Sequence, residues 1–158
     1  MGLISMYVDR EAALRHPIAP MPFDIERGRL RFFAETVGIT DPVYFDVDAA
    51  RAAGHRDILV PPTFLSNSLE LSLPNPFGWL AELGVDLTRS THGSQGFTYH
   101  RPAYANDTVV FHRRIVDVYT RKGGALEFVV KQSDVMIGDT LLLESRFISA
   151  IRHPEALA

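Results

Sequence analysis

The pattern of hydrophobic and polar residues changes half-way along the chain, from helical spacing to strand-like alternation. Near the middle, residues 63–73 carry apolar side chains at helical spacing and almost no charge. A helix with so little charge is typical of a protein interior. The preceding pair Pro61-Pro62 suits a helix entry, because proline's fixed φ fits the first turn and its missing N–H is not needed there. We therefore predict a long buried helix that begins at Thr63.

Four segments of the second half have the length and alternation of strands, and turn sequences separate them. They are residues 90–101, 108–119, 125–136 and 140–152. Because the connections are short, we expect an antiparallel meander. The predicted fold is α+β, with one long central helix wrapped by a curved antiparallel β-sheet.

The first half predicts two shorter helices, an amphipathic one over residues 26–37 and a second over 47–53. The start of the chain shows no clear period, so we expect residues 1–15 to form a loosely held arm, in which Asp9 to Leu14 could make a short helical turn. Residues 16–153 then make a single domain, and residues 154–158 a C-terminal tail.

Composition narrows the function classes without naming one. The chain has 158 residues, of which 46% are hydrophobic and 22% charged, as expected of one globular domain. A net charge of −3 argues against a nucleic-acid surface. The absence of cysteine excludes disulfides and thiolate chemistry. No apolar run reaches membrane-spanning length and no signal-peptide pattern opens the chain, so a cytoplasmic protein is expected.

Six short segments occur in an order that is typical of one family. They are RFFAETVG at 31–38, DPVY at 41–44, DAARAAG at 48–54, VPPTF at 60–64, HGSQGFTYHRP at 92–102 and ND at 106–107. Through them the chain resembles the MaoC-like hydratase/dehydratase family of the hot-dog fold. It is most similar to the N-terminal type found in fungal fatty-acid-synthase dehydratase regions and in mycobacterial 3-hydroxyacyl-ACP dehydratase subunits.

The resemblance implies a hydro-lyase of fatty acid metabolism whose ligand is an acyl thioester, on CoA or on acyl carrier protein (ACP). It implies no cofactor beyond that substrate. It also implies a homodimer, or a heterodimer with a second hot-dog subunit. In active members an aspartate and a histidine activate a water, which adds to the β-carbon of a 2-enoyl thioester or is lost from a 3-hydroxyacyl thioester.

This chain departs from the family at that acid–base pair. Ile39 stands where the aspartate is expected, and Tyr44 stands at the histidine position. Asp41 occupies the place of an asparagine between them. Isoleucine cannot move a proton, and a tyrosine hydroxyl with a usual pKa near 10 is a poor base at neutral pH. The usual pair is therefore absent.

Asp41 and His92 are the candidate catalytic substitutes. Asp41 is the nearest carboxylate to the missing pair, although an aspartate before a proline more commonly shapes a turn. His92 begins the first long strand near the expected cleft, and its ordinary alternative is a polar residue at a strand edge. Tyr44 could donate a hydrogen bond to the substrate, or pack with its hydroxyl at the surface.

Three further residues are candidates for substrate binding. Thr63 and Phe64 could present backbone N–H groups to the thioester carbonyl from a helix N-terminus, or could form an ordinary cap. The alternation places Gln95, with Phe97 and Tyr99, on the helix-facing side of its strand, where Gln95 could orient substrate or tie the helix to the sheet. The histidines show no spacing that indicates a metal site.

We therefore expect a hydratase/dehydratase-type subunit that binds an acyl thioester beside a catalytic partner. Two alternatives stay open. One is a self-sufficient enoyl-CoA hydratase that uses Asp41 and His92. The other is a hot-dog thioesterase, or a non-catalytic binder of acyl thioesters.

Overall fold

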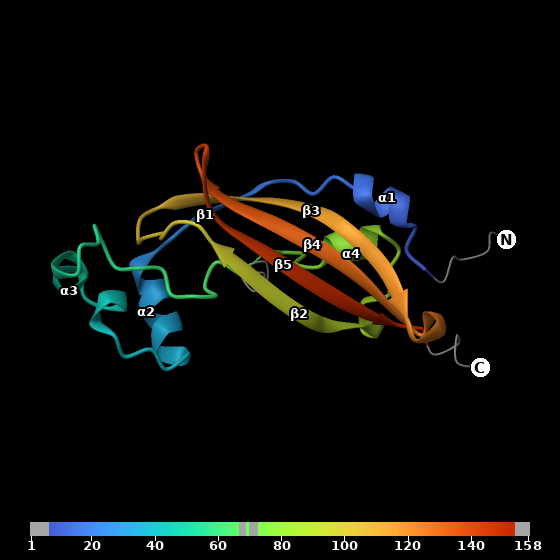
Figure 1. Cartoon of the computed structure of the whole chain (residues 1–158), viewed down its shortest axis with the longest axis horizontal. Helices are drawn as coiled ribbons and strands as arrows, with labels where there is room; N and C mark the ends of the chain where they lie inside the picture. Colours follow the sequence, from blue (N-terminus) through green and yellow to red (C-terminus); the bar gives the residue numbers. More distant parts are fainter. Residues whose placement is uncertain (1–6, 67–68, 70–72, 154–158) are drawn as a thin grey trace.

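The computed structural model describes residues 7–66, 69 and 73–153, and its centre is one five-stranded antiparallel sheet. The strands curve along their length, with α1 and α4 at one end of the molecule and α2 and α3 at the other (Figure 1). The strands are β1 (Met21–Asp24), β2 (Ser90–Tyr99), β3 (Thr108–Arg121), β4 (Leu126–Ile137) and β5 (Thr140–Arg152). The predicted α+β class and the curved antiparallel sheet are confirmed.

The helices of the described chain are short. Among the described residues, none has the length and hydropathy needed to span a bilayer. The α-helices are α1 (Arg10–Arg15), α2 (Arg27–Thr36), α3 (Val47–Ala52) and α4 (Gly78–Glu82), and the 3-10 turns are η1 (Pro42–Tyr44), η3 (Leu87–Arg89) and η4 (Lys122–Gly124).

The predicted meander is correct for β3, β4 and β5 but wrong for β2. The strand order is β1-β3-β4-β5-β2, so β2 pairs with β5 and not with its sequence neighbour β3. The reason is the segment 100–107, which is too long for a tight hairpin. It runs beside residues 58–60 through the Leu59–Tyr104 bridge and a 3.0 Å bond from the Val60 N–H to the Ala103 carbonyl. This segment carries the chain across the end of the sheet and leaves β2 at an edge.

The helix predicted to begin at Thr63 does not begin there. Residues 62–66 form turns and bends, and Thr63 has a φ of 67°, in the left-handed region that a helix start excludes. Residues 67–68 and 70–72 lie outside the described part of the chain. The prediction of burial is confirmed for Phe64, Leu65 and Leu69, which are in the core, whereas Leu73 is only half-buried and packs against them.

The N-terminal arm is held more firmly than predicted over its described part. Asp9 caps α1 by accepting a bond from the Ala12 N–H, and Ala13 is fully buried. Arg10 pairs with Asp117 of β3 at 3.2 Å. The short helical turn expected at Asp9 to Leu14 is thereby confirmed as α1. The predicted tail 154–158 lies outside the described residues.

Two apolar clusters fill the inner side of the sheet. One gathers Phe64, Leu65 and Leu69 with residues of α2, β3 and β5, and the other gathers Trp79 and Leu80 of α4 with the opposite half of the sheet. The molecule therefore has two halves along the strands, and the position of a residue along a strand decides which half it can serve.

A buried carboxylate ties the α2 end to the start of β3. Arg27 of α2 donates to both oxygens of Asp57, at 3.0 and 2.6 Å. The Ile58 N–H and the Asn106 side chain donate to the same carboxylate, at 2.8 and 3.3 Å. The Arg27 guanidinium, followed by the Ile58 and Asn106 donors, lowers the pKa of Asp57 against the opposing effect of burial.

This network predicts a loss of stability in acid. A lowered pKa in the folded state means that the stabilisation by Asp57 is present above its unfolded pKa of about 4 and disappears as pH falls through the folded pKa. Asp57→Asn should therefore lower the free energy of unfolding by about 1.5–3 kcal/mol at pH 7, with a difference that shrinks below pH of about 4. Urea unfolding at several pH values measures this. Asp48→Asn, at a side chain that is 95% exposed, is the matched control. If the loss of unfolding free energy caused by Asp57→Asn did not change with pH, the lowered pKa assigned to Asp57 would be contradicted.

Candidate functional site

The loop before α3 holds the residues at the family's acid–base positions, and it is built as a capped turn. Asp41 accepts a 3.1 Å bond from the Val43 N–H and begins η1. Asp41 is exposed, and Tyr44 and Ile39 are half-buried. Asp41 therefore shapes the turn, as one of its two interpretations expects. A catalytic role for Asp41 stays a prediction.

The turn at residues 61–66 approaches the end of β2 through one hydrogen bond. The Thr63 N–H donates to the Tyr99 hydroxyl at 3.0 Å. The Phe64 N–H donates to the Pro61 carbonyl at 3.1 Å, and the Phe64 side chain is only 4% exposed. The expectation of two free N–H groups at a helix N-terminus is wrong for this arrangement, because each N–H already has a partner within the chain. Substrate binding by Thr63 or Phe64 stays a prediction.

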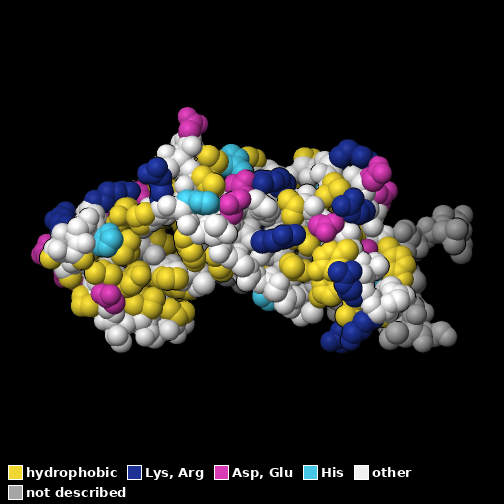
Figure 2. Space-filling model, viewed as in Figure 1, with side chains coloured by type: hydrophobic (Ala, Val, Ile, Leu, Met, Phe, Trp, Pro, Cys, Tyr) yellow, Lys and Arg dark blue, Asp and Glu magenta, His cyan; other side chains and the backbone are white. Residues whose placement is uncertain are grey.

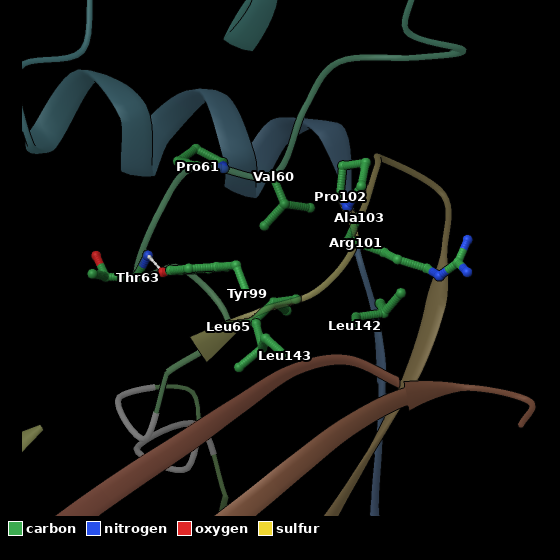
Figure 3. Close-up of a pocket in the computed structure, with 10 residues that line it drawn as sticks. All are labelled: Val60, Pro61, Thr63, Leu65, Tyr99, Arg101, Pro102, Ala103, Leu142 and Leu143. Atoms are coloured by element: carbon green, nitrogen blue, oxygen red, sulfur yellow. Dashed lines mark hydrogen bonds between the residues drawn. The ribbon is translucent and has the colours of Figure 1, made fainter. Parts of the chain in front are cut away.

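A small pocket lies beside this contact (Figure 3). Its volume is about 50 Å³, enough for a single small group. In Figure 3 the Tyr99 ring reaches across to Thr63, and the Arg101 side chain points away from that pair. The lining residues are Val60, Pro61, Thr63, Leu65, Tyr99, Arg101, Pro102, Ala103, Leu142 and Leu143. Apart from the Thr63–Tyr99 contact and Arg101, the side chains around this pocket are apolar.

A second, larger apolar groove is lined by Phe64 and by residues of α2. It has a volume of about 400 Å³ and runs along α2, where Phe32 is 73% exposed. Figure 2 shows hydrophobic side chains gathered at the end of the molecule that holds α2 and α3. Its lining residues are Gly28, Arg29, Phe32, Phe33, Phe64 and Leu69. A groove of this size and lining is typical of small-molecule sites.

Gln95 lies on the inner side of β2, as the alternation predicted. Its side-chain amide donates to the Ser145 hydroxyl of β5 at 3.2 Å, and Ser145 is 3% exposed. This bond ties the edge strand to its neighbour. This hydrogen bond gives Gln95 a structural role within the sheet. A contact between Gln95 and substrate stays a prediction.

His92 lies near the opposite end of β2 from Tyr99, roughly 20 Å away at about 3.3 Å per strand residue. A bulge between His92 and Ser94 shifts the register, so His92 pairs with Ser149 and its ring packs on Phe147 at 5.1 Å. Strict alternation would have placed His92 on the same side as Ser94, and the bulge turns it to the inner side. The side chain remains exposed.

The structure therefore brings together only some of the candidates. Thr63 and Phe64 meet at one end of β2, and the chain near Tyr44 comes close through a 3.2 Å bond from the Leu59 N–H to the Val43 carbonyl. His92 packs on the cluster around Trp79, in the other half of the sheet. Asp41 begins η1, between α2 and α3, whereas His92 packs on this other cluster, and catalytic roles for both stay predictions.

Tyr99 is the residue of this site that sequence reasoning did not single out. The alternation placed its side chain on the same side as Gln95 and Phe97, which is correct. The contact with the Thr63 N–H depends on the left-handed turn at Thr63, and no local pattern announces that turn. The described residues contain no group of three or more His, Cys, Asp or Glu side chains placed to hold a metal ion.

Known proteins that are similar to this chain show its family and agree with its fold. Residues 12–139 match the family model described as "FAS1-like, dehydratase domain region". The chain belongs to this family. It is 36% identical over 113 residues to a UPF0336 protein of Parafrankia sp., covering 72% of this chain and 74% of the relative. It is 40% identical over 110 residues to a UPF0336 protein of Clavibacter michiganensis, covering 68% and 72%.

Solved structures confirm the hot-dog fold of MaoC-like dehydratases. The truncated HadBC 3R-hydroxyacyl-ACP dehydratase complex of Mycobacterium tuberculosis matches with a TM-score of 0.65 at 22% identity, covering 83% of this chain and 91% of that one. The ChsH1-ChsH2 complex of the same organism matches with 0.73 at 22%, covering 90% and 87%. A MaoC-like dehydratase matches with 0.70 at 20%, covering 87% and 42%. The chain is thus a hot-dog protein of a dehydratase/hydratase family.

Proposed function

We propose that this chain is a subunit of an enoyl-thioester hydratase/dehydratase, acting on 2-enoyl or 3-hydroxyacyl thioesters of CoA or ACP. A second hot-dog subunit supplies the acid–base pair. The observation that carries the proposal is the loop 38–44. It keeps the family's turn but holds Ile39 and Tyr44 at the reacting positions, and its carboxylate, Asp41, is engaged as a cap.

The chemistry explains why a partner is needed. In hydration the water oxygen bonds to the β-carbon, one water proton passes to a base, and a proton is delivered to the α-carbon. Both proton transfers need an ionisable group within hydrogen-bond reach of the substrate. Ile39 has no such group. Asp41 and His92, the substitutes that a self-sufficient enzyme would use, lie at separate parts of the molecule, so no observation favours that alternative.

The edge strand β2 is a suitable surface for the partner. Within the described part of the chain its ten residues pair with β5 on one side only, and most of its side chains are exposed. An unpaired edge of this length favours association with another chain. Two of the similar structures, HadBC and ChsH1-ChsH2, are complexes.

The groove along α2 is the place proposed for the acyl chain. Its aromatic and aliphatic lining favours an apolar ligand, and the exposed Phe32 at its edge would be covered by one. Arg29 lies beside it, with its guanidinium over the Phe23 ring at 4.9 Å. The groove adjoins the Thr63–Phe64 turn, so a chain bound there would have its thioester near the pocket of Tyr99.

Assembly in solution tests the subunit proposal. We expect sedimentation at micromolar concentration to show a dimer or larger species, either of this chain alone or together with a hot-dog protein that carries the intact Asp and His. Thr98→Pro, at the exposed edge, should weaken this association because proline disturbs strand pairing. Thr120→Pro, at the exposed end of β3, is the matched control. Only 17.7 kDa species with every partner tried would contradict the proposal.

A further inference from the structure

The Tyr99 hydroxyl has one hydrogen bond in the described part of the chain, and in that bond it is the acceptor. The Thr63 N–H donates to it at 3.0 Å (Figure 3). A phenol carries one proton to donate as well as lone pairs to accept. The proton of Tyr99 is therefore available to a ligand, and the 54% exposure of the residue leaves room for one.

The backbone at Thr63 is a second, independent observation. Its φ of 67° is uncommon for a non-glycine residue, and a β-branched residue in this region is a clear outlier. Such conformations persist only where the surroundings hold them, and they cluster at ligand sites. Here the strained turn aims the Thr63 N–H at Tyr99.

The two groups form a chain of donors. An N–H that donates to a hydroxyl polarises it and strengthens the hydrogen bond that the hydroxyl itself donates. The pocket beside Tyr99 holds about 50 Å³ and is lined largely by aliphatic side chains, which strengthen a hydrogen bond formed there. Such a pocket fits a single acceptor atom with its substituents and has no room for a larger polar ligand.

We infer that Tyr99 is a substrate-binding residue whose hydroxyl donates to the thioester carbonyl oxygen, while Thr63 acts through it as a positioning residue. The inference rests on the proposed function and names the group that holds the reacting carbonyl. The Thr63 N–H reaches the carbonyl through the Tyr99 hydroxyl, in place of the direct contact expected from a helix N-terminus.

The test compares two ligands that differ at the carbonyl. Crotonyl-CoA carries the thioester oxygen, and S-(2-butenyl)-CoA is the thioether of the same unsaturated four-carbon chain without it. Titration of the full chain with each gives two dissociation constants. We expect the unmodified chain to prefer crotonyl-CoA by about 3- to 10-fold, the range of one net hydrogen bond. Tyr99→Phe should remove that preference and leave the affinity for S-(2-butenyl)-CoA unchanged.

Tyr119→Phe is the matched control, because Tyr119 stacks on Phe128 far along β3 and lines no part of the pocket. It should keep the preference. A preference that survives Tyr99→Phe would overturn the inference alone. Tighter binding of crotonyl-CoA by Tyr99→Phe would also overturn it, by showing that the hydroxyl blocks the carbonyl site. An unmodified chain that binds neither ligand would overturn the proposed function together with the inference.

Discussion

Replacing Phe64 by alanine should lower the free energy of unfolding by about 3–5 kcal/mol, the usual cost of emptying a core aromatic site. Phe64 is 4% exposed and packs edge-on against Phe33 at 5.4 Å between ring centroids. It also meets Phe23 at 6.1 Å. The three rings join the turn at 61–66 to α2 and β1, so their loss affects three elements together.

Urea unfolding measures this effect, and Phe32→Ala is the matched control. Phe32 lies on the same helix and is 73% exposed, so its removal should change stability by no more than about 0.5 kcal/mol. Equal effects of the two substitutions would show that the turn at 61–66 does not pack as described. A small effect of both would place the core elsewhere.

Hydration of a 2-enoyl thioester should rise by about 10²- to 10⁴-fold when this chain is combined with a hot-dog subunit that carries the intact Asp and His. That factor is the usual contribution of positioned general acid–base groups. The reason is chemical, because Ile39 and Tyr44 offer no base at neutral pH. In the complex, removal of the partner's Asp or His should cancel the gain, whereas Asp41→Asn and His92→Gln in this chain should leave the rate within about 2-fold.

The strands could be predicted from the sequence because the alternation that marks each strand is a local property of the chain. Alternation over residues 90–152 gave the four long strands nearly residue by residue, and it placed Gln95 on the inner side. The partner of each strand depends on the path of the connections. The segment 100–107 crosses the end of the sheet through contacts with residues 58–60, which are far away in sequence.

The turn at Thr63 shows the limit of the same reasoning. Apolar spacing correctly indicated that Phe64, Leu65 and Leu69 are buried, but burial is shared by buried helices and by turns packed under a sheet. The proline pair before Thr63 predicts a helix entry. In the structure the Tyr99 hydroxyl and the left-handed backbone of Thr63 hold a turn, and this tertiary contact is absent from any local pattern.

The arrangement of the candidate site residues is harder to predict from the sequence than their identity. The prediction that the acid–base pair is missing rests on Ile39 and Tyr44 alone. Whether Asp41 and His92 could replace it depended on their distance, which the bulge near Ser94 and the strand order determine. A one-residue bulge reverses the side of a strand on which His92 lies, so no count along the sequence could settle its place.

The most direct test of the central claim is one initial-rate measurement, hydration of 2-enoyl-CoA substrates by the purified chain alone and by the chain with its catalytic hot-dog partner. We predict that the chain alone binds 2-enoyl-CoA without appreciable hydration, and that the pair hydrates it. Rapid hydration by the chain alone, unchanged in Asp41→Asn and His92→Gln, would contradict both the subunit role and the choice of residues.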